Sequence, residues 1–208
     1  MTLPLVRAQN PADRLPLVAF AVAGTAFALQ ATAQLVDFWA FHLRFDFLNG
    51  NSTASAFSWV SAIAIFGTGV AFVGLVVRVP DHRRVTATVV LLFTFLLIDN
   101  RAHLHERIPH GKVLFLPALG IAFGLLWYFS GLGSPRTRLL VRVGLCFLAA
   151  SLFIHLVGPT VLSWAGWQSD DWQYQVKVAL KESTEKAGWI LVCFGALADL
   201  WSRHAEQR

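Results

Sequence analysis

Long apolar segments constrain this chain more than any other feature of its sequence. Five or six stretches reach the roughly 20 residues that an α-helix needs to cross about 30 Å of hydrocarbon. We place them at residues 15–36, 56–77, 85–105, 113–131, 139–157 and 178–201. Because the connections are short, we expect one domain over residues 1–208, an all-α, polytopic membrane helix bundle with six transmembrane helices.

Composition supports the membrane assignment. Only 14% of the residues are charged and 56% are hydrophobic, whereas soluble domains usually carry about 25% charged residues. The formal net charge of +5 is explained by arginines that would gather at the inner ends of the spans, as cytoplasmic loops require. These are Arg7, Arg14, Arg78, Arg83, Arg84, Arg136, Arg138, Arg142, Arg203 and Arg208. We therefore expect both termini in the cytoplasm of a bacterial cell, a multi-pass protein of the inner membrane, and no nucleic acid as a partner.

The N-terminal span has an alternative interpretation as a signal peptide. Arg14 precedes an apolar run that ends near Ala31-Thr32-Ala33, a sequence of small residues that resembles a cleavage site. The run is long for a signal peptide, and Gln30 suits a polar-lined bundle, so we favour a first transmembrane helix.

The two predicted outer loops are rich in aromatic residues. Residues 37–55 and 159–175 alternate Phe and Trp with polar groups. Tryptophan and tyrosine are enriched where a membrane meets water, so these loops are typical of an aromatic belt. The alternative is a lid over a lipid-sized ligand.

Ionisable residues occur where the helices should still be apolar. The run 85–98 leads directly into Asp99, and residues 181–186 (Lys-Glu-Ser-Thr-Glu-Lys) lead into the last span. Charged groups in hydrocarbon cost about 2.5–3.5 kcal/mol each, so they mark a functional site by default. At a helical rise of about 1.5 Å per residue, polar groups from different helices fall at one level, roughly 20–24 Å from the arginine-rich ends. They are Gln30, Asp99, His155 and Glu185.

The residue types at this level suit a metal site. Asp99, His103 and Glu106 share one helical stripe, and Glu182 and Glu185 share another. Carboxylates and imidazoles from facing helices build metal centres in bundles, and the oxygen and nitrogen ligands suit a divalent ion such as zinc, iron or manganese. The candidate ligands are Asp99, His103, His105, Glu106 and His155.

Catalysis at such a site would need a base and a group that holds the substrate. We expect Glu182 or Glu185 to activate a water molecule and Ser58 to orient the substrate, with Asn51 as a further member. The sequence thus predicts metal-assisted hydrolysis or transfer on a lipid or another amphipathic molecule in the outer leaflet.

Two alternatives use the same residues without chemistry of this kind. Arg101, Arg107, Lys181 and Lys186 lie among the acids, and charges inside membranes usually pair with one another. The first alternative is therefore a buried salt-bridge network in a structural subunit of a membrane complex. The second is a proton or ion path.

Expected partners follow from the membrane setting. Membrane lipid is the first of them, with a homo-oligomer or a larger complex as further alternatives. Gly120 and Gly124 form a GxxxG pattern, which lets membrane helices pack closely.

With these motifs in hand, the chain resembles a group of uncharacterised bacterial polytopic membrane proteins. The similarity covers about residues 46–201 and is carried by Gly50-Asn51 with Phe57-Ser58, Asp99 with His105-Glu106, and Glu182 and Glu185 with Gly188-Trp189. Members of that group carry acidic residues at the positions that Asn100 and Lys181 occupy in this chain. Both replacements would weaken a divalent-metal site. The chain is also loosely similar to ceramidase-type intramembrane metal hydrolases, but lacks their His-x-x-x-His pair on the last helix. The first resemblance implies no known activity.

Overall fold

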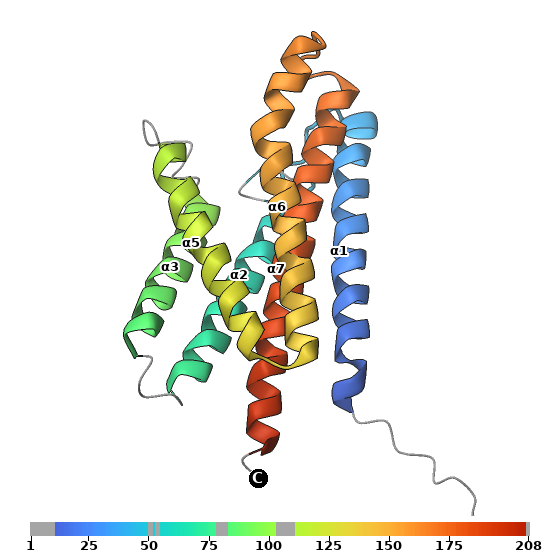
Figure 1. The fold of residues 1–208 in the computed structure, drawn as a ribbon. Coiled ribbons are helices and arrows are strands. Elements are labelled where there is room, and N and C mark those ends of the chain that lie inside the picture. The colour runs from blue at the N-terminus through green and yellow to red at the C-terminus, as the bar shows by residue number, and fades with distance from the viewer. Residues whose placement is uncertain (1–10, 50–51, 53–54, 78–82, 103–110, 207–208) are drawn as a thin grey trace, which may run out of the picture.

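Six α-helices that alternate in direction make up the described part of the protein (Figure 1). The computed structural model describes the backbone of residues 11–49, 52, 55–77, 83–102 and 111–206, and the side chains of 14–49, 52, 55–74, 90–99 and 115–202. The helices are α1 (Pro11–Phe41), α2 (Ala56–Val77), α3 (Arg83–Ala102), α5 (Gly111–Leu132), α6 (Pro135–Trp164) and α7 (Trp172–Glu206). These ranges contain no β-strand, which confirms the all-α prediction.

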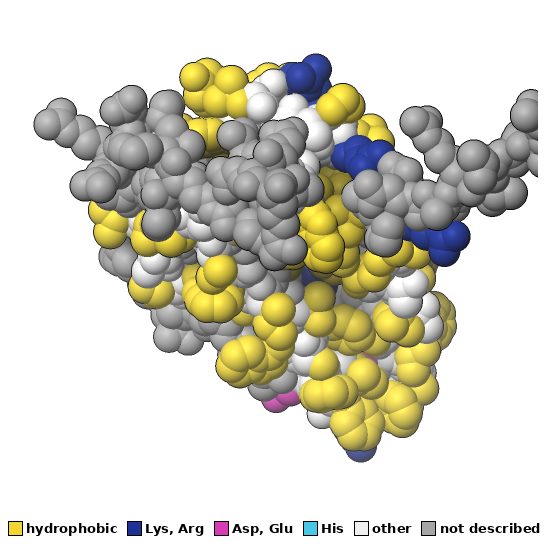
Figure 2. Space-filling model, turned by 90° about the horizontal axis from the view of Figure 1, so that it is seen from below, with side chains coloured by type: hydrophobic (Ala, Val, Ile, Leu, Met, Phe, Trp, Pro, Cys, Tyr) yellow, Lys and Arg dark blue, Asp and Glu magenta, His cyan; other side chains and the backbone are white. Residues whose placement is uncertain are grey.

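Four of the helices are long and apolar enough to cross a membrane. They contain the segments Arg14–Phe41, Ala56–Gly74, Phe115–Leu132 and Pro135–Trp164. Hydrophobic side chains also cover most of the described surface seen from the lower end of the bundle (Figure 2). The protein therefore has the character of a membrane protein.

The helix ends compare closely with the expected spans. α2 begins and ends as predicted, at residues 56 and 77. The spans expected at 15–36, 113–131, 139–157 and 178–201 each lie within a longer helix. α3 holds a shorter apolar segment, Val90–Asp99, and residues 103–105 of its expected span lie outside the described residues.

Five helices form a closed ring, and the sixth lies outside it. Around the ring, α7 packs against α2, α2 against α3, α3 against α5, α5 against α6, and α6 again against α7. α1 packs almost entirely on α7 (Figure 1). α7 is therefore the central helix, with neighbours on several sides, and its charged residues between positions 177 and 199 are buried or half-buried.

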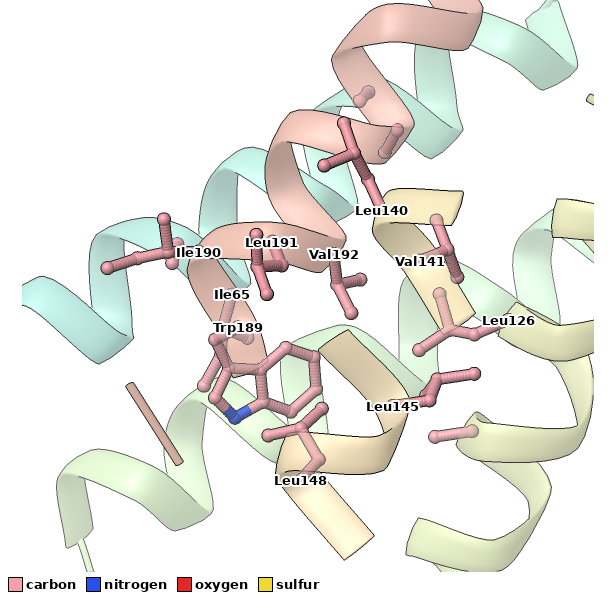
Figure 3. Packing of buried hydrophobic residues seen from close by; sticks show 14 of the residues in the cluster. Ile65, Leu126, Leu140, Val141, Leu145, Leu148, Trp189, Ile190, Leu191 and Val192 are labelled. Atoms are coloured by element: carbon pink, nitrogen blue, oxygen red, sulfur yellow. The ribbon is translucent and has the colours of Figure 1, made fainter. Parts of the chain in front are cut away.

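The contact between α6 and α7 is the most extensive between described helices, and glycines lie on both sides of it. A Cβ atom added to Gly188 would lie 2.7 Å from Leu148 Cγ and 2.9 Å from the Gly144 carbonyl oxygen, while one added to Gly195 would lie 2.6 Å from Val141 Cγ2. Small residues let helix backbones approach in this way. Around the contact, Leu140, Val141, Leu145, Leu148, Trp189, Leu191 and Val192 form the hydrophobic core (Figure 3).

A tight turn joins α5 to α6 at the arginine-rich end of the bundle. Ser134 caps α6, its hydroxyl oxygen accepting a hydrogen bond from the Thr137 backbone nitrogen at 3.2 Å, and Pro135 occupies the first turn of the helix, where its missing N–H is harmless. The Arg142 guanidinium lies 4.4 Å from the ring centroid of Trp127 on α5, a cation–π contact. These contacts hold the two helices together at this end.

Candidate functional site

A cavity of about 130 Å³ lies inside the ring, towards the end of the bundle that carries the aromatic loops. Every helix of the ring lines it, and α1 does not. Five side chains expected at the site on sequence grounds line this cavity: Ser58, Asp99, His155, Glu182 and Glu185. Four different helices thus bring these groups to one place.

The remaining wall of the cavity divides into an apolar and a polar part. The apolar part consists of Ile65, Leu96, Phe115, Leu116, Leu119, Phe123, Leu148, Leu152, Leu156 and Trp189. The polar part adds Ser52, Ser61, Ser151, Lys181 and Lys186. Ser61 and Ser151 were missed by the sequence interpretation, although Ser61 follows Ser58 by one helical turn and therefore shares its face. The cavity is amphipathic.

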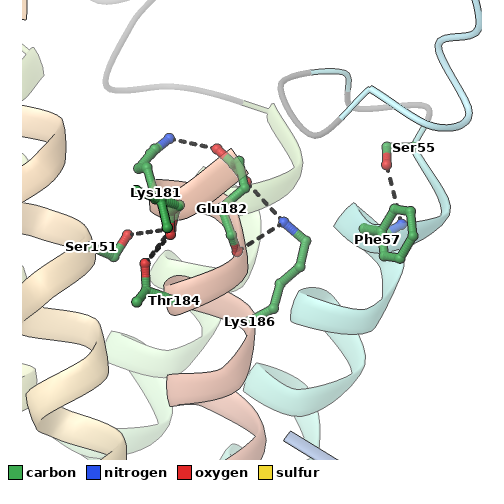
Figure 4. Close-up of polar contacts among 8 residues, drawn as sticks. Ser55, Phe57, Ser151, Lys181, Glu182, Thr184 and Lys186 are labelled. Carbon is green, nitrogen blue, oxygen red and sulfur yellow. Dashed lines mark hydrogen bonds and ion pairs between the residues drawn. The ribbon is translucent and has the colours of Figure 1, made fainter. Parts of the chain in front are cut away.

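Glu182 lies between two lysines on α7 (Figure 4). Its Oε1 is 2.7 Å from Lys181 Nζ and its Oε2 is 2.8 Å from Lys186 Nζ. The Lys186 side chain is only 2% exposed, and a buried ammonium group is tolerated only where a charge partner is supplied. Both carboxylate oxygens of Glu182 thus accept hydrogen bonds from lysine, which makes this residue a counterion of Lys181 and Lys186.

The backbone of the lysine–glutamate cluster is tied to the neighbouring helix. The Ser151 hydroxyl on α6 donates to the Lys181 carbonyl oxygen at 2.9 Å, and the Thr184 hydroxyl donates to the same oxygen at 3.0 Å (Figure 4). One turn farther along α7 comes Gly188, at the close contact with α6. The cluster is therefore anchored on a closely packed pair of helices.

The other titratable groups come from three helices. Asp99 is buried near the end of α3, whereas His155 on α6 and Glu185 on α7 are half-buried. Each of the three takes part in interactions within the protein. The cavity thus offers two carboxylates and an imidazole besides the cluster on α7, the groups that proton transfer requires.

The expected metal site is covered only in part. His103, His105, Glu106 and Asn51 lie outside the described residues. Among the residues that the structure does describe, no group of three His, Cys, Asp or Glu side chains is arranged to hold a metal ion. Asp99 and His155 are the described candidate ligands that line the cavity.

Gln30 lies elsewhere than expected. It is fully buried on α1 but does not line the cavity. Together with Gln34 and Asp37 it forms a polar stripe on α1, and Gln34 Nε2 donates to Gln175 Oε1 of α7 at 2.8 Å. The level of Gln30 stays a prediction, and Gln30 does not reach the cavity because α1 packs outside the ring.

Comparison with protein families gives one match. A domain of unknown function (DUF8692) matches residues 12–200. The chain belongs to this family. The match covers the described cavity, four helices completely, and all of α1 and α7 but their outer ends, so the site is part of the family's domain. Comparisons with curated proteins and with solved structures give no match.

Proposed function

We propose that this member of the DUF8692 family is a six-span protein of the bacterial inner membrane, with both termini in the cytoplasm, that binds and converts a lipid-like molecule in the outer leaflet. The observation that supports this is the cavity, in which titratable side chains of α3, α6 and α7 adjoin an apolar wall. A pocket of this kind fits a ligand with a polar head and an apolar tail.

The charges on α7 agree with a sixth span. Lys186 and Glu182 are buried against each other, and α7 is packed by α1, α2 and α6. Ionisable residues within membrane spans almost always face the interior of the bundle and pair there. α7 can therefore cross the bilayer although its charges give it a low mean hydropathy.

The proposed reaction is hydrolysis or transfer at the ligand's head. Glu185 or His155 would accept a proton from the attacking water or hydroxyl group, and Ser58 would orient the head by hydrogen bonding. If a divalent ion takes part, Asp99 and His155 would offer it an oxygen and a nitrogen ligand, beside His103, His105 and Glu106.

A lipid-conversion assay tests the enzymatic proposal. Detergent-purified protein is incubated with a total bacterial lipid extract, with and without added zinc, iron or manganese, and the products are followed by mass spectrometry. We expect conversion by the parent and a loss of about 10²–10⁴-fold in Glu185→Gln and His155→Ala, the usual contribution of acid–base catalysis. Asp170→Asn, in the exposed loop before α7, is the matched control and should retain activity. An extract left unchanged by the well-folded parent would overturn the proposal.

One observation favours a second candidate, a structural role. Both oxygens of Glu182 are bound by lysines of the same helix, as expected of a network that holds a subunit of a complex together. In that case Glu182→Gln would lower stability, whereas His155→Ala and Glu185→Gln would change no lipid-dependent property.

A further inference from the structure

We propose that the ligand of this cavity is a zwitterionic phospholipid with a phosphoethanolamine head, which enters from the bilayer between α5 and α6. This inference rests on the proposed function, since it names the ligand of the same cavity. Two independent features support it, the shape of the opening and the distribution of charge.

The opening lies where α5 and α6 separate. The two helices are joined at the turn Gly133–Ser134 and diverge from it towards the end that carries the aromatic loops (Figure 1). Leu116 of α5 and Leu156 of α6 line the cavity, and they are 36% and 46% exposed. The part of the cavity wall that these two helices form is therefore not sealed by packing. A ligand already in the bilayer can therefore reach the cavity sideways.

The walls of this opening suit acyl chains. Phe115 and Leu119 of α5 face the cavity together with Leu152 of α6. The described wall that these two helices form has no Asp, Glu, Lys or Arg, and its polar residues are Ser151 and His155. Such a surface is as apolar as the bilayer interior, so acyl chains that move into it keep an apolar environment. A water-soluble molecule would gain nothing from this part of the site.

The polar end of the cavity carries charges of both signs. Lys181 and Lys186 both bind Glu182, so two ammonium groups lie beside one carboxylate at this end of the wall. Lys181 is its accessible member, because its side chain is 19% exposed whereas that of Lys186 is 2% exposed. An ammonium group on the cavity wall is suited to a phosphate oxygen, and such charge-assisted hydrogen bonds are about twice as strong as neutral ones.

Two further carboxylates on the cavity wall supply the negative charge that an ammonium group of the ligand requires. Asp99 of α3 and Glu185 of α7 line the same cavity, and either is suited to the ammonium group of the ligand. A phosphoethanolamine head carries both required charges within a few bonds. A phosphoglycerol head lacks the ammonium group, and diacylglycerol lacks both charges, so the site should discriminate among lipids with identical chains.

Native mass spectrometry of the delipidated full chain measures this discrimination. The probes are dioleoyl phosphatidylethanolamine, dioleoyl phosphatidylglycerol, dioleoylglycerol and the soluble head glycerophosphoethanolamine. We expect phosphatidylethanolamine to bind about tenfold more tightly than phosphatidylglycerol, the effect of one charged hydrogen bond. Glycerophosphoethanolamine should bind at least about a hundredfold more weakly than the lipid, because it has no chains.

Variants test recognition of the lipid head and entry through the opening separately. Lys181→Gln should weaken both phospholipids, Asp99→Asn should remove the preference for phosphatidylethanolamine, and Lys181→Arg should retain binding because it keeps the charge. Leu116→Trp narrows the opening and should weaken every lipid. Its matched control is Ile121→Trp, also on the exposed surface of α5 but outside the cavity lining, which should bind as the parent does. The melting temperature of each variant is measured first, and Lys181→Arg and Leu116→Trp remain informative if Lys181→Gln fails to fold.

The possible results test recognition of the head, entry from the bilayer and the proposed function separately. Equal binding of phosphatidylethanolamine and dioleoylglycerol would overturn recognition of the head, and equal binding of the soluble head and the lipid would overturn entry from the bilayer. If the lipid extract is converted in a His155-dependent way but phosphatidylethanolamine is not preferred, the further inference fails and the proposed function stands. If no lipid is bound and none is converted, both fail.

Discussion

The two contacts of α6 differ in kind. Against α7 it packs so closely that a Cβ atom on Gly144 would lie 2.8 Å from the Gly188 carbonyl oxygen. Against α5 it is held near the turn and then diverges, and the cavity occupies part of the space between them. The difference teaches how one bundle can combine a rigid support with an accessible site: the titratable cluster lies on the tight pair, and the opening lies on the loose one.

Removal of the Glu182 carboxylate, on the closely packed pair of α6 and α7, should have the largest effect on stability. Glu182→Gln leaves Lys186 buried without a charge partner, and breaking a buried ion pair in this way typically costs about 3–5 kcal/mol. We expect a lower melting temperature in detergent by circular dichroism. The double variant Glu182→Gln/Lys186→Met should recover most of the loss, because it also removes the buried cation. A single variant as stable as the parent would show that the lysines need no counterion.

Overpacking of the tight contact should have the next largest effect. In Gly188→Ala the added Cβ atom would meet Leu148 Cγ at 2.7 Å and the Gly144 carbonyl oxygen at 2.9 Å. Backbone atoms cannot move aside cheaply, so we expect a loss of about 1–3 kcal/mol in the free energy of unfolding, the usual cost of overpacking. The same thermal measurement checks it. An unchanged melting temperature would mean that α6 and α7 can separate without cost.

The hydrogen bond from Ser151 of α6 to the backbone of the lysine–glutamate cluster on α7 should contribute less to stability. Ser151→Ala removes the donor to the Lys181 carbonyl oxygen, which keeps the hydrogen bond from Thr184. We expect a loss of about 1 kcal/mol. Ser163→Ala, on the exposed end of the same helix, controls for the change in helix propensity and should be close to neutral.

Sequence reasoning found the helices and much of the site because both follow from local rules. Apolar length fixed α2 to the residue, and the cost of charge in hydrocarbon indicated that Asp99 and Glu185 face the interior, where both line the cavity. The sequence could not show in which direction a side chain points or which residues it binds. Gln30 is buried, but on a helix outside the ring, and only three-dimensional geometry shows that Glu182 is bound by two lysines at once.

Glycine patterns show the same limit. Gly120 and Gly124 form the recognisable GxxxG, yet a Cβ atom at either would meet nothing within 4 Å. The closest packing instead involves Gly144, Gly188 and Gly195, which are spread over two helices. A motif within one helix records that close approach is possible, whereas the approach itself depends on which helix lies opposite.

The smallest effect on the stability of the monomer is therefore expected on α5, which diverges from α6. Gly120→Ala and Gly124→Ala add methyl groups to open space, and alanine is favoured over glycine in a helix by about 1 kcal/mol, so stability should stay equal or rise slightly. Chemical cross-linking in native membranes extends the test, because the exposed GxxxG face of α5 could be covered by a second copy of the chain. If Gly120→Leu leaves the melting temperature of the detergent-solubilised monomer unchanged but removes a cross-linked dimer, the face is an oligomer contact. If no dimer forms in the parent, the face contacts lipid, and the loose side of the bundle stays open to the bilayer from which the ligand would enter.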